Sequence, residues 1–168
     1  MDFKFWNNKR VFLTGHSGFK GSWLTVWLKK MGAIVKGYSL EPDYQKSMFQ
    51  LLNLQSLVEN EFNDIRNFNS LKDSINNFKP DIIFHLAAQP LVRESYKDPL
   101  STYEVNVMGT ANLLEASRTC KNLKSVVVVT TDKCYENKEW YWGYREDEAM
   151  GGFDPYSSSK GCCELLVN

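Results

Sequence analysis

The stretch Thr14-Gly15-His16-Ser17-Gly18-Phe19-Lys20-Gly21 decides the fold of this chain. It follows a short apolar run that begins at Arg10, and it leads into a segment whose apolar residues recur at helical spacing. In such a strand–turn–helix unit, the first glycine makes the tight turn and the second lets the backbone approach a pyrophosphate. The third glycine removes the side chain that would hold the helix off the sheet. A plain glycine-rich turn has the same letters, but the position in the first strand–helix unit favours dinucleotide binding.

Strand and helix patterns alternate along the rest of the chain. After the first strand, residues 10–14, we expect strands at residues 33–38, 58–63, 81–87 and 125–131. Helices are expected at residues 18–31, 46–57, 69–78, 99–120 and 156–167. Continuous apolar runs such as Val126 to Val129 are typical of parallel strands that are buried on both faces. The sequence therefore predicts an α/β fold of the Rossmann type, with a doubly wound parallel sheet.

Composition restricts the class of protein. The 168 residues carry 20 basic and 20 acidic side chains, so the net charge is zero, and 14% of the residues are aromatic. This balance argues against nucleic-acid binding by bulk charge and against a polybasic membrane anchor. The N-terminus shows no secretory signal, and no apolar run is long enough to span a bilayer. We expect one NAD-binding Rossmann domain over residues 1–168.

The four cysteines predict neither a metal site nor a disulfide framework. They are Cys120, Cys134, Cys162 and Cys163, and no CxxC pair occurs among them. Adjacent cysteines on a helix cannot both point toward the same ligand. Reduced thiols in a cytoplasmic protein are the expected state.

The expected ribose-binding acid is missing at the end of the second strand. Ser39 stands there and could hydrogen-bond a ribose hydroxyl or accept a 2′-phosphate nearby. Glu41 could reach a ribose, but it fits a solvated loop better. No arginine stands near Ser39 to hold a 2′-phosphate, which favours NAD over NADP. Asp64 and Ile65, after the third strand, are expected to meet an adenine ring.

Two clusters predict catalysis. The fifth predicted strand ends in Thr130, Thr131, Asp132 and Lys133, at the edge of a parallel sheet where ligands bind. Tyr156 and Lys160 are four residues apart and share one helix face. A nearby ammonium stabilises a phenolate, so such a tyrosine could take the proton from a sugar hydroxyl while hydride leaves.

Other chemistry-bearing side chains are less decisive. His85 lies within an apolar strand, where a histidine usually satisfies its hydrogen bonds in the core. His16 lies in the glycine turn and is assigned to the cofactor. Trp140, Tyr141 and Trp142 could form a platform for a nucleotide sugar or could simply pack together.

Several motifs follow one another in a fixed order: the TGxxGFxG turn, Ile83 to Ala88, Asn106 to Thr110, and Tyr156-x-x-x-Lys160. Together they resemble the extended short-chain dehydrogenase/reductase family over essentially the whole chain. The resemblance narrows to the CDP-glucose 4,6-dehydratase branch of that family on five strings: Gly15 to Leu24, Ala87 to Val92, Thr130 to Asn137, Trp140 to Arg145 and Met150 to Tyr156.

The resemblance implies an enzyme that uses tightly held NAD to convert CDP-glucose to CDP-4-keto-6-deoxyglucose and water. C4 is oxidised, water is eliminated across C5 and C6, and hydride returns to C6. By matching position, Tyr156 is the C4 base, Lys160 tunes it and orients the nicotinamide ribose, and Thr131 hydrogen-bonds near O4. Asp132 would protonate the departing C6 hydroxyl. Lys133 stands where related dTDP-glucose dehydratases have a glutamate base, and it could act as a neutral base or as a cation beside an enolate.

The resemblance also implies the contacts with ligands. The cofactor residues are expected to be Gly15, His16, Ser17, Gly18, Phe19, Lys20, Gly21, Ser39, Asp64, Ile65, Leu86, Ala87, Ala88, Asn106, Thr130, Tyr156 and Lys160. Gln89 and Thr131 are assigned to the substrate. The partner is a nucleotide sugar, CDP-glucose, with no nucleic acid or membrane, and the parent enzyme is expected to be a homodimer.

In this family a substrate domain follows the Tyr-x-x-x-Lys helix, whereas this sequence stops at Asn168. We therefore expect an N-terminal fragment that is inactive by itself. Two alternatives stay open. Another nucleotide-sugar dehydratase or a 4-epimerase would share the tyrosine and lysine, but an epimerase needs no acid at Asp132. A non-catalytic dinucleotide-binding module would need neither Tyr156 nor Lys160.

Overall fold

The computed structural model describes residues 3–42 and 44–168, which form two compact units. Unit 1 comprises residues 1–87 and 112–129, and unit 2 comprises residues 88–111 and 130–168. The boundary passes through one continuous helical segment, between Ala111 and Asn112. The expectation of a single NAD-binding domain stays a prediction.

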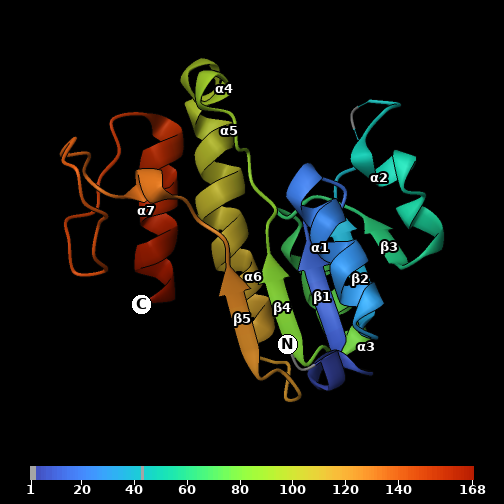
Figure 1. Ribbon diagram of the computed structural model, residues 1–168. Helices are drawn as coiled ribbons and strands as arrows, with labels where there is room; N and C mark the ends of the chain where they lie inside the picture. Colours follow the sequence, from blue (N-terminus) through green and yellow to red (C-terminus); the bar gives the residue numbers. More distant parts are fainter. Residues whose placement is uncertain (1–2, 43) are drawn as a thin grey trace. The chain divides into compact units, whose positions relative to one another are not determined.

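Unit 1 is built on a parallel sheet of five strands (Figure 1). The strands are β1 (Arg10–Thr14), β2 (Ile34–Ser39), β3 (Glu59–Phe62), β4 (Ile82–His85) and β5 (Ser125–Val128). Their order is β3-β2-β1-β4-β5, and every pair is parallel. The strand order reverses direction between β1 and β4, which is the position where ligands bind in sheets of this kind. The predicted fold class is confirmed.

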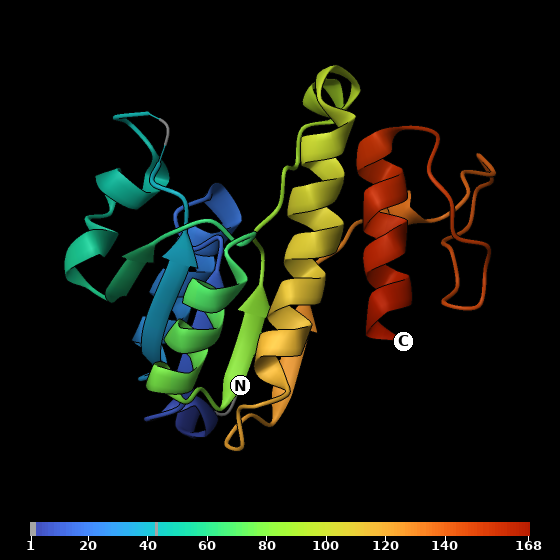
Figure 2. The same cartoon turned by 180° about the vertical axis from the view of Figure 1, so that it is seen from behind.

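Helices cover both faces of this sheet. Helix α1 (Phe19–Lys30) lies over one face in Figure 1. Helix α3 (Phe68–Phe78) lies over the opposite face, which Figure 2 shows. The C-terminal part of α6 (Gly109–Ser117) lies beside α3, since Asn112 donates hydrogen bonds to the carbonyls of Ile65 and Arg66 just before that helix. Short elements complete the unit: η1 (Phe3–Trp6), α2 (Met48–Leu51) and η2 (Leu54–Ser56).

The core of unit 1 lies on both faces of the central strands, against α1 on one face and α3 on the other. Phe12, Leu13 and Ile83 are fully buried in the strands, and Leu28 is fully buried on α1. Burying each side chain of this size contributes about 1.5–3 kcal/mol to folding. The prediction that the apolar runs of β1 and β4 form buried strands is therefore confirmed. The run of β5 differs, because β5 is an edge strand and Val127 is 41% exposed.

Helix α1 turns its small residues toward the sheet and its aromatic residues toward solvent. Gly21, Ser22 and Thr25 are buried, whereas Phe19 and Trp23 are 68% and 58% exposed. The helical spacing was predicted correctly, but the aromatic face is the outer one. The cause is close packing: a Cβ added to Gly21 would lie 2.1 Å from the carbonyl oxygen of Gly15.

Two predicted helices are interrupted. The segment 46–57 contains α2 and η2, separated by Asn53, whose φ of 48° places it in the left-handed region and ends the first helix. The segment 99–120 contains α5 (Pro99–Tyr103), a π-helical turn η3 (Glu104–Met108) and α6. One helix, α4 (Val92–Lys97), was not predicted. Such local breaks are set by backbone hydrogen bonding, which apolar spacing does not reveal.

Unit 2 places α7 (Pro155–Val167) against α4 and α5, as both Figure 1 and Figure 2 show. The short turn η4 (Asp132–Cys134) also packs on α7. Asp154 caps α7, because its carboxylate accepts hydrogen bonds from the backbone N–H and the hydroxyl of Ser157. Pro155 occupies the first turn, where its missing N–H costs nothing.

His16 is a buried hydrogen-bonding centre of unit 1. Its Nε2 lies 3.0 Å from Asn60 Oδ1 and its Nδ1 lies 3.0 Å from Ser39 Oγ. The ring also stacks on Phe62 at a centroid distance of 5.9 Å. A Cβ on Gly37 would lie 2.2 Å from this ring, so the glycine makes room for it. Burial lowers the pKa of His16 to about 4, because the charged form loses its hydration.

We predict that His16 makes unit 1 less stable in mild acid. The pKa of His16 is about 4 in the folded chain and 6.5 unfolded, so only the unfolded chain binds a proton between these values. The free energy of unfolding should fall by about 3 kcal/mol as the pH drops through this window. Urea unfolding of His16→Gln, which cannot titrate, should show a flatter pH dependence from 6.5 to 4. An equally steep fall in the variant would contradict the assignment.

We also predict that Gly21→Ala is destabilising. The new methyl group would press on the backbone of the glycine turn, which cannot move as a side chain can. Overpacking of this kind costs about 1–3 kcal/mol. The matched control is Gly143→Ala, where nothing lies within 4 Å of an added Cβ. Thermal unfolding should separate the two variants, and equal midpoints would show that α1 can shift at no cost.

Candidate functional site

The glycine turn of unit 1 lies directly against the segment that follows β4. Gly15 has a φ of +72°, and a Cβ on it would lie 2.7 Å from the backbone nitrogen of Ala87. Thr14 holds the two segments together, since its hydroxyl accepts hydrogen bonds at 3.2 Å from the N–H groups of Leu86 and Ala87. The structure therefore brings the predicted cofactor residues Gly15, Leu86 and Ala87 together where the strand order reverses.

The start of α1 is suited to an anion. Gly18 is the N-cap, and it supplies no side-chain hydrogen bond to the first turn. The first turn contains no acidic residue, while Lys20 is exposed there. Free N–H groups and the helix dipole together favour a phosphate at such an end. The residues present thus fit the diphosphate of a dinucleotide.

The end of β2 presents hydroxyl groups where many dinucleotide sites have a carboxylate. Ser39 is buried, and its hydroxyl lies 2.9 Å from Ser17 Oγ and 3.0 Å from His16 Nδ1. Ser17 donates in turn to the carbonyl of Leu40. The imidazole of His16 points into the interior and hydrogen-bonds with Ser39 there. Because the side chain is fully buried, its ring cannot contact a ligand directly.

Asp64 and Ile65 follow β3 as expected. The Arg66 guanidinium holds the pKa of Asp64 below its usual range, with a contact of 2.7 Å between Nη2 and Oδ2. Ile65 is buried at 5% exposure. Asp64 is thus an ionised, partly exposed carboxylate next to an apolar side chain.

In unit 2, Tyr156 and Lys160 lie on consecutive turns of α7. Tyr156 is partly exposed, whereas Lys160 is buried at 6% exposure. Their helix is fixed by Asn106 in the π-helical turn η3, whose Nδ2 donates to Ser159 Oγ at 2.8 Å. Asn106 also accepts from the N–H of Gln89 at 2.8 Å. This network sets the position of α7 relative to the segment around Ala88 within unit 2.

Asp132 and Lys133 form an exposed ion pair on η4. Lys133 Nζ lies 3.5 Å from Asp132 Oδ1, and the two side chains are 56% and 83% exposed. The hydroxyl of Thr131 donates to Asp132 at 3.0 Å. The Thr131 hydroxyl and the Lys133 charge lower the pKa of Asp132. In this solvated state Asp132 is ionised at neutral pH.

Two predicted contacts are already occupied by the protein. The side-chain amide of Gln89 is bonded to Thr102 and to both backbone groups of Leu91. Thr130 donates a hydrogen bond to the carboxylate of Glu164. Sequence reasoning missed Glu164, although it stands one helical turn after Lys160. The roles of all these site residues stay predictions.

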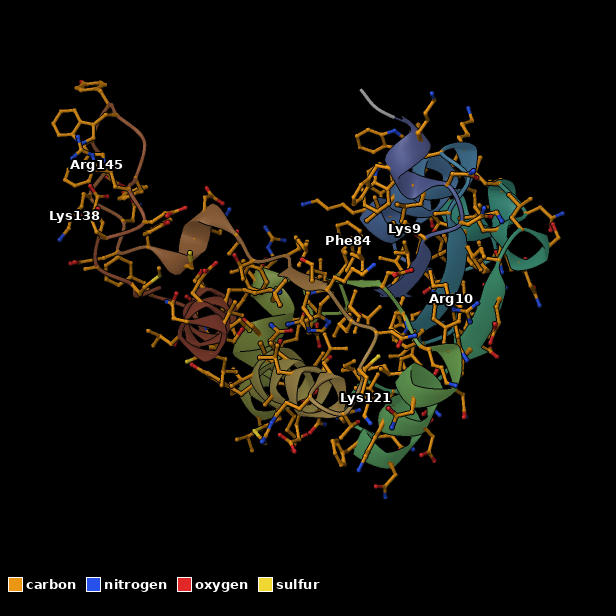
Figure 3. All side chains as sticks on the ribbon, turned by 90° about the horizontal axis from the view of Figure 1, so that it is seen from below. Lys9, Arg10, Phe84, Lys121, Lys138 and Arg145 are labelled. Carbon is orange, nitrogen blue, oxygen red and sulfur yellow. The ribbon has the colours of Figure 1, made fainter. Side chains whose placement is uncertain are left out.

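The segment from Tyr135 to Met150 is a closed loop in unit 2. Tyr135 pairs with Met150 in an antiparallel bridge, and Gly151 donates to the carbonyl of Cys134 at 2.8 Å. Inside the loop, the rings of Tyr135 and Tyr144 stack at 5.3 Å with only 6° between their planes. Figure 3 labels Lys138 and Arg145, which lie on the outer part of this loop.

The tryptophans of this loop pack on one another. The rings of Trp140 and Trp142 stack at 5.2 Å, and Trp140 also contacts Tyr144 at 5.4 Å. Tyr141 is fully exposed. Packing is thus shown for two of the three aromatic residues at 140–142.

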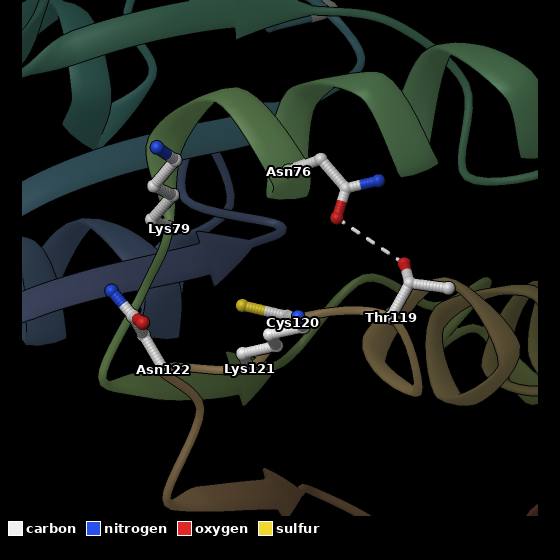
Figure 4. A pocket seen from close by; sticks show the side chains of 6 residues that line it. All are labelled: Asn76, Lys79, Thr119, Cys120, Lys121 and Asn122. Atoms are coloured by element: carbon white, nitrogen blue, oxygen red, sulfur yellow. Dashed lines mark hydrogen bonds between the residues drawn. The ribbon is translucent and has the colours of Figure 1, made fainter.

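A cavity of about 350 Å³ in unit 2 is bordered by Asp132, Lys133, Tyr135 and Tyr144. A second one, of about 340 Å³, is lined in unit 1 by Asn76, Lys79 and Thr119 to Asn122 (Figure 4). The second cavity lies among the loops that precede β4 and β5, at the end of the sheet away from the glycine turn.

Metal and membrane sites find no support in the described part of the chain. Residues 3–42 and 44–168 contain no group of three or more His, Cys, Asp or Glu side chains that could hold a metal ion. The four cysteines are free thiols. No helix within these ranges has the length and apolar character needed to cross a bilayer.

Three known proteins are similar to this chain over nearly its whole length. The CDP-glucose 4,6-dehydratase of Salmonella typhimurium is 58% identical over 168 residues, which are 100% of this chain and 47% of that protein. The structure of the UDP-glucose 4-epimerase of Thermus thermophilus, solved with NAD, is 28% identical in sequence and has a TM-score of 0.79. The match covers 94% of this chain and 49% of that protein. The Brucella ovis enzyme of the same name, also solved with NAD, is 25% identical with a TM-score of 0.80, covering 95% and 46%.

The chain spans about half the length of these relatives. The resemblance to CDP-glucose 4,6-dehydratases that the motifs indicated is confirmed by the 58% identity. The family profile of GDP-mannose 4,6 dehydratase matches residues 12–168. With nearly the whole sequence inside that match, the chain belongs to the GDP-mannose 4,6 dehydratase family.

Proposed function

We propose that the protein is an NAD-dependent CDP-glucose 4,6-dehydratase, which forms CDP-4-keto-6-deoxyglucose and water. The observation that carries the proposal lies in unit 2. The turn η4, with Asp132 and Lys133, packs against α7, which carries Tyr156 and Lys160. A tyrosine–lysine pair suffices for oxidation at C4. An additional acid–base pair beside it is what elimination of water requires.

NAD is the proposed cofactor, held by the glycine turn of unit 1. The close approach of Gly15 to Ala87 and the uncapped start of α1 fit its diphosphate. When bound, NAD would accept a hydride from C4 and return it to C6. Two structural relatives solved with NAD support this choice.

Tyr156 is proposed as the base that takes the proton from the C4 hydroxyl. A phenol has an ordinary pKa near 10, so the base form needs a positive charge close by. Lys160, buried one turn further along α7, would provide that charge in a setting of low dielectric. Asn106 and Ser159 keep α7 in place, so the phenol is held rather than free to move.

Asp132 and Lys133 are proposed to carry out the elimination. Oxidation at C4 acidifies the proton at C5, and Lys133 either removes it or stabilises the enolate that forms. Asp132 is ionised while it is solvated, so it needs a covering substrate to become an acid. Removing water from a carboxylate raises its pKa, which would let Asp132 hold a proton for the departing C6 hydroxyl.

The decisive experiment uses the full-length protein with NAD and CDP-glucose. Mass spectrometry of the sugar nucleotide should show the loss of one water. An unchanged mass together with an epimerised sugar would select a 4-epimerase instead, and no reaction would favour a non-catalytic dinucleotide-binding module.

We also propose a cytoplasmic homodimer, and the free thiols fit a reducing compartment.

Replacing Tyr156 by phenylalanine should remove catalysis and spare cofactor binding. The substitution deletes only the phenol oxygen, so ring packing on α7 is kept. Loss of a general base lowers turnover by about 10²–10⁴-fold. Turnover and NAD affinity are measured by absorbance and calorimetry, with Tyr141→Phe as the control at a fully exposed tyrosine. Near-normal turnover of Tyr156→Phe would remove it from the base role.

Replacing Asp132 by asparagine should stop the reaction after C4 oxidation. The amide keeps the shape of the side chain and can still accept from Thr131, but it cannot donate a carboxylic proton. Single-turnover mixing should show NADH accumulating while dehydrated product stays absent. Product that forms at the normal rate would exclude Asp132 as the acid.

A further inference from the structure

The cavity beside Asp132 and Lys133 is lined by two chemically different groups of side chains. One is the acid–base pair, whose two side chains are exposed to solvent. The other is the stacked pair of rings of Tyr135 and Tyr144. Its volume of about 350 Å³ lies within the range of small-molecule subsites, about 300–1,000 Å³.

The stacked rings of Tyr135 and Tyr144 are held rigidly within their loop. The bridge between Tyr135 and Met150 closes the loop, and the N–H of Glu136 donates to the carbonyl of Ala149 at 2.9 Å. The phenol of Tyr144 is fixed as well, because it accepts from the N–H of Lys138 at 2.7 Å and donates to Asn137 Oδ1 at 3.2 Å. A compact loop that is packed by its own side chains is often functional.

The other charge at the cavity is already engaged. Asp154 borders the cavity, but both of its oxygens accept hydrogen bonds from Ser157 as the cap of α7. The cavity therefore combines one reactive acid–base pair with two aromatic rings in its lining. This combination suits a carbon that loses a hydroxyl and becomes a methyl group.

We propose that this cavity receives the C5–C6 end of the hexose, and that Tyr144 determines which substituent at C6 is accepted. The inference rests on the proposed dehydratase function and deepens it. Asp132 and Lys133 act on C6 and C5, so the cavity that they border lies next to these atoms. The Tyr144 ring limits the space beyond C6, and its apolar face suits the methyl group of the product.

The experiment compares two substrates with the full-length protein, CDP-glucose and CDP-xylose, the second of which lacks C6. In Tyr144→Ala, kcat/KM for CDP-glucose should fall about tenfold, the discrimination typical of one carbon in an apolar pocket. Single-turnover C4 oxidation of CDP-xylose should change less than twofold. An equal fall for both substrates would overturn the proposal.

A gain of function separates the proposal from damage to the fold. The enlarged cavity of Tyr144→Ala should oxidise CDP-6-O-methylglucose faster than the unmodified protein does, and failure to do so counts against the proposal. Asp147→Ala, a truncation at an exposed position of the same loop, should leave all three rates unchanged. If the unmodified protein oxidises none of the three substrates, the dehydratase function itself fails.

Discussion

The contact on which unit 1 depends is the approach of α1 to the glycine turn. A Cβ on Gly21 would lie 2.1 Å from the Gly15 carbonyl, and a Cβ on Gly15 would lie 2.7 Å from the nitrogen of Ala87. Three backbone segments therefore meet without side chains between them. This packing directs the start of α1 at the end of the sheet where the strand order reverses, and it leaves free N–H groups there for a phosphate.

The same close packing explains why His16 is buried in a turn that would otherwise face solvent. Its ring occupies the space that Gly37 leaves open and bonds to Ser39 at the end of β2 and to Asn60 of β3, so both strands are tied to the turn. The ring stays neutral, because burial lowers its pKa. A hydroxyl group backed by a neutral imidazole thus takes the place of the usual carboxylate at the end of β2.

Unit 2 is organised around α7 in a comparable way. Asp154 begins the helix, and Asn106 of the π-helical turn holds its middle through Ser159. Cys163 adds a third link, since its thiol donates to the carbonyl of Asn106 at 3.1 Å. The helix that carries the proposed base Tyr156 is therefore held in place by several hydrogen bonds, while Asp132 and Lys133 remain solvated on η4. Tyr156 is thus preorganised, whereas Asp132 and Lys133 depend on a bound substrate to exclude water.

The sequence by itself determined the order of the five strands, the glycine turn, the placement of Tyr156 and Lys160 on one helix, and the family, because these depend on local spacing and on motifs. Only the tertiary structure decided which face of α1 is buried, where the 99–120 helix contains a π-helical turn, and that His16 lies inside. It also revealed the stacking of Tyr135 on Tyr144 and the hydrogen bond from Thr130 to Glu164. The physical reason is that these features arise from side-chain contacts across the fold or, for the π-helical turn, from backbone hydrogen bonding, and apolar spacing reveals neither. Periodicity can show that Phe19 and Trp23 share a helix face, but only the close approach at Gly21 decides that this face points outward.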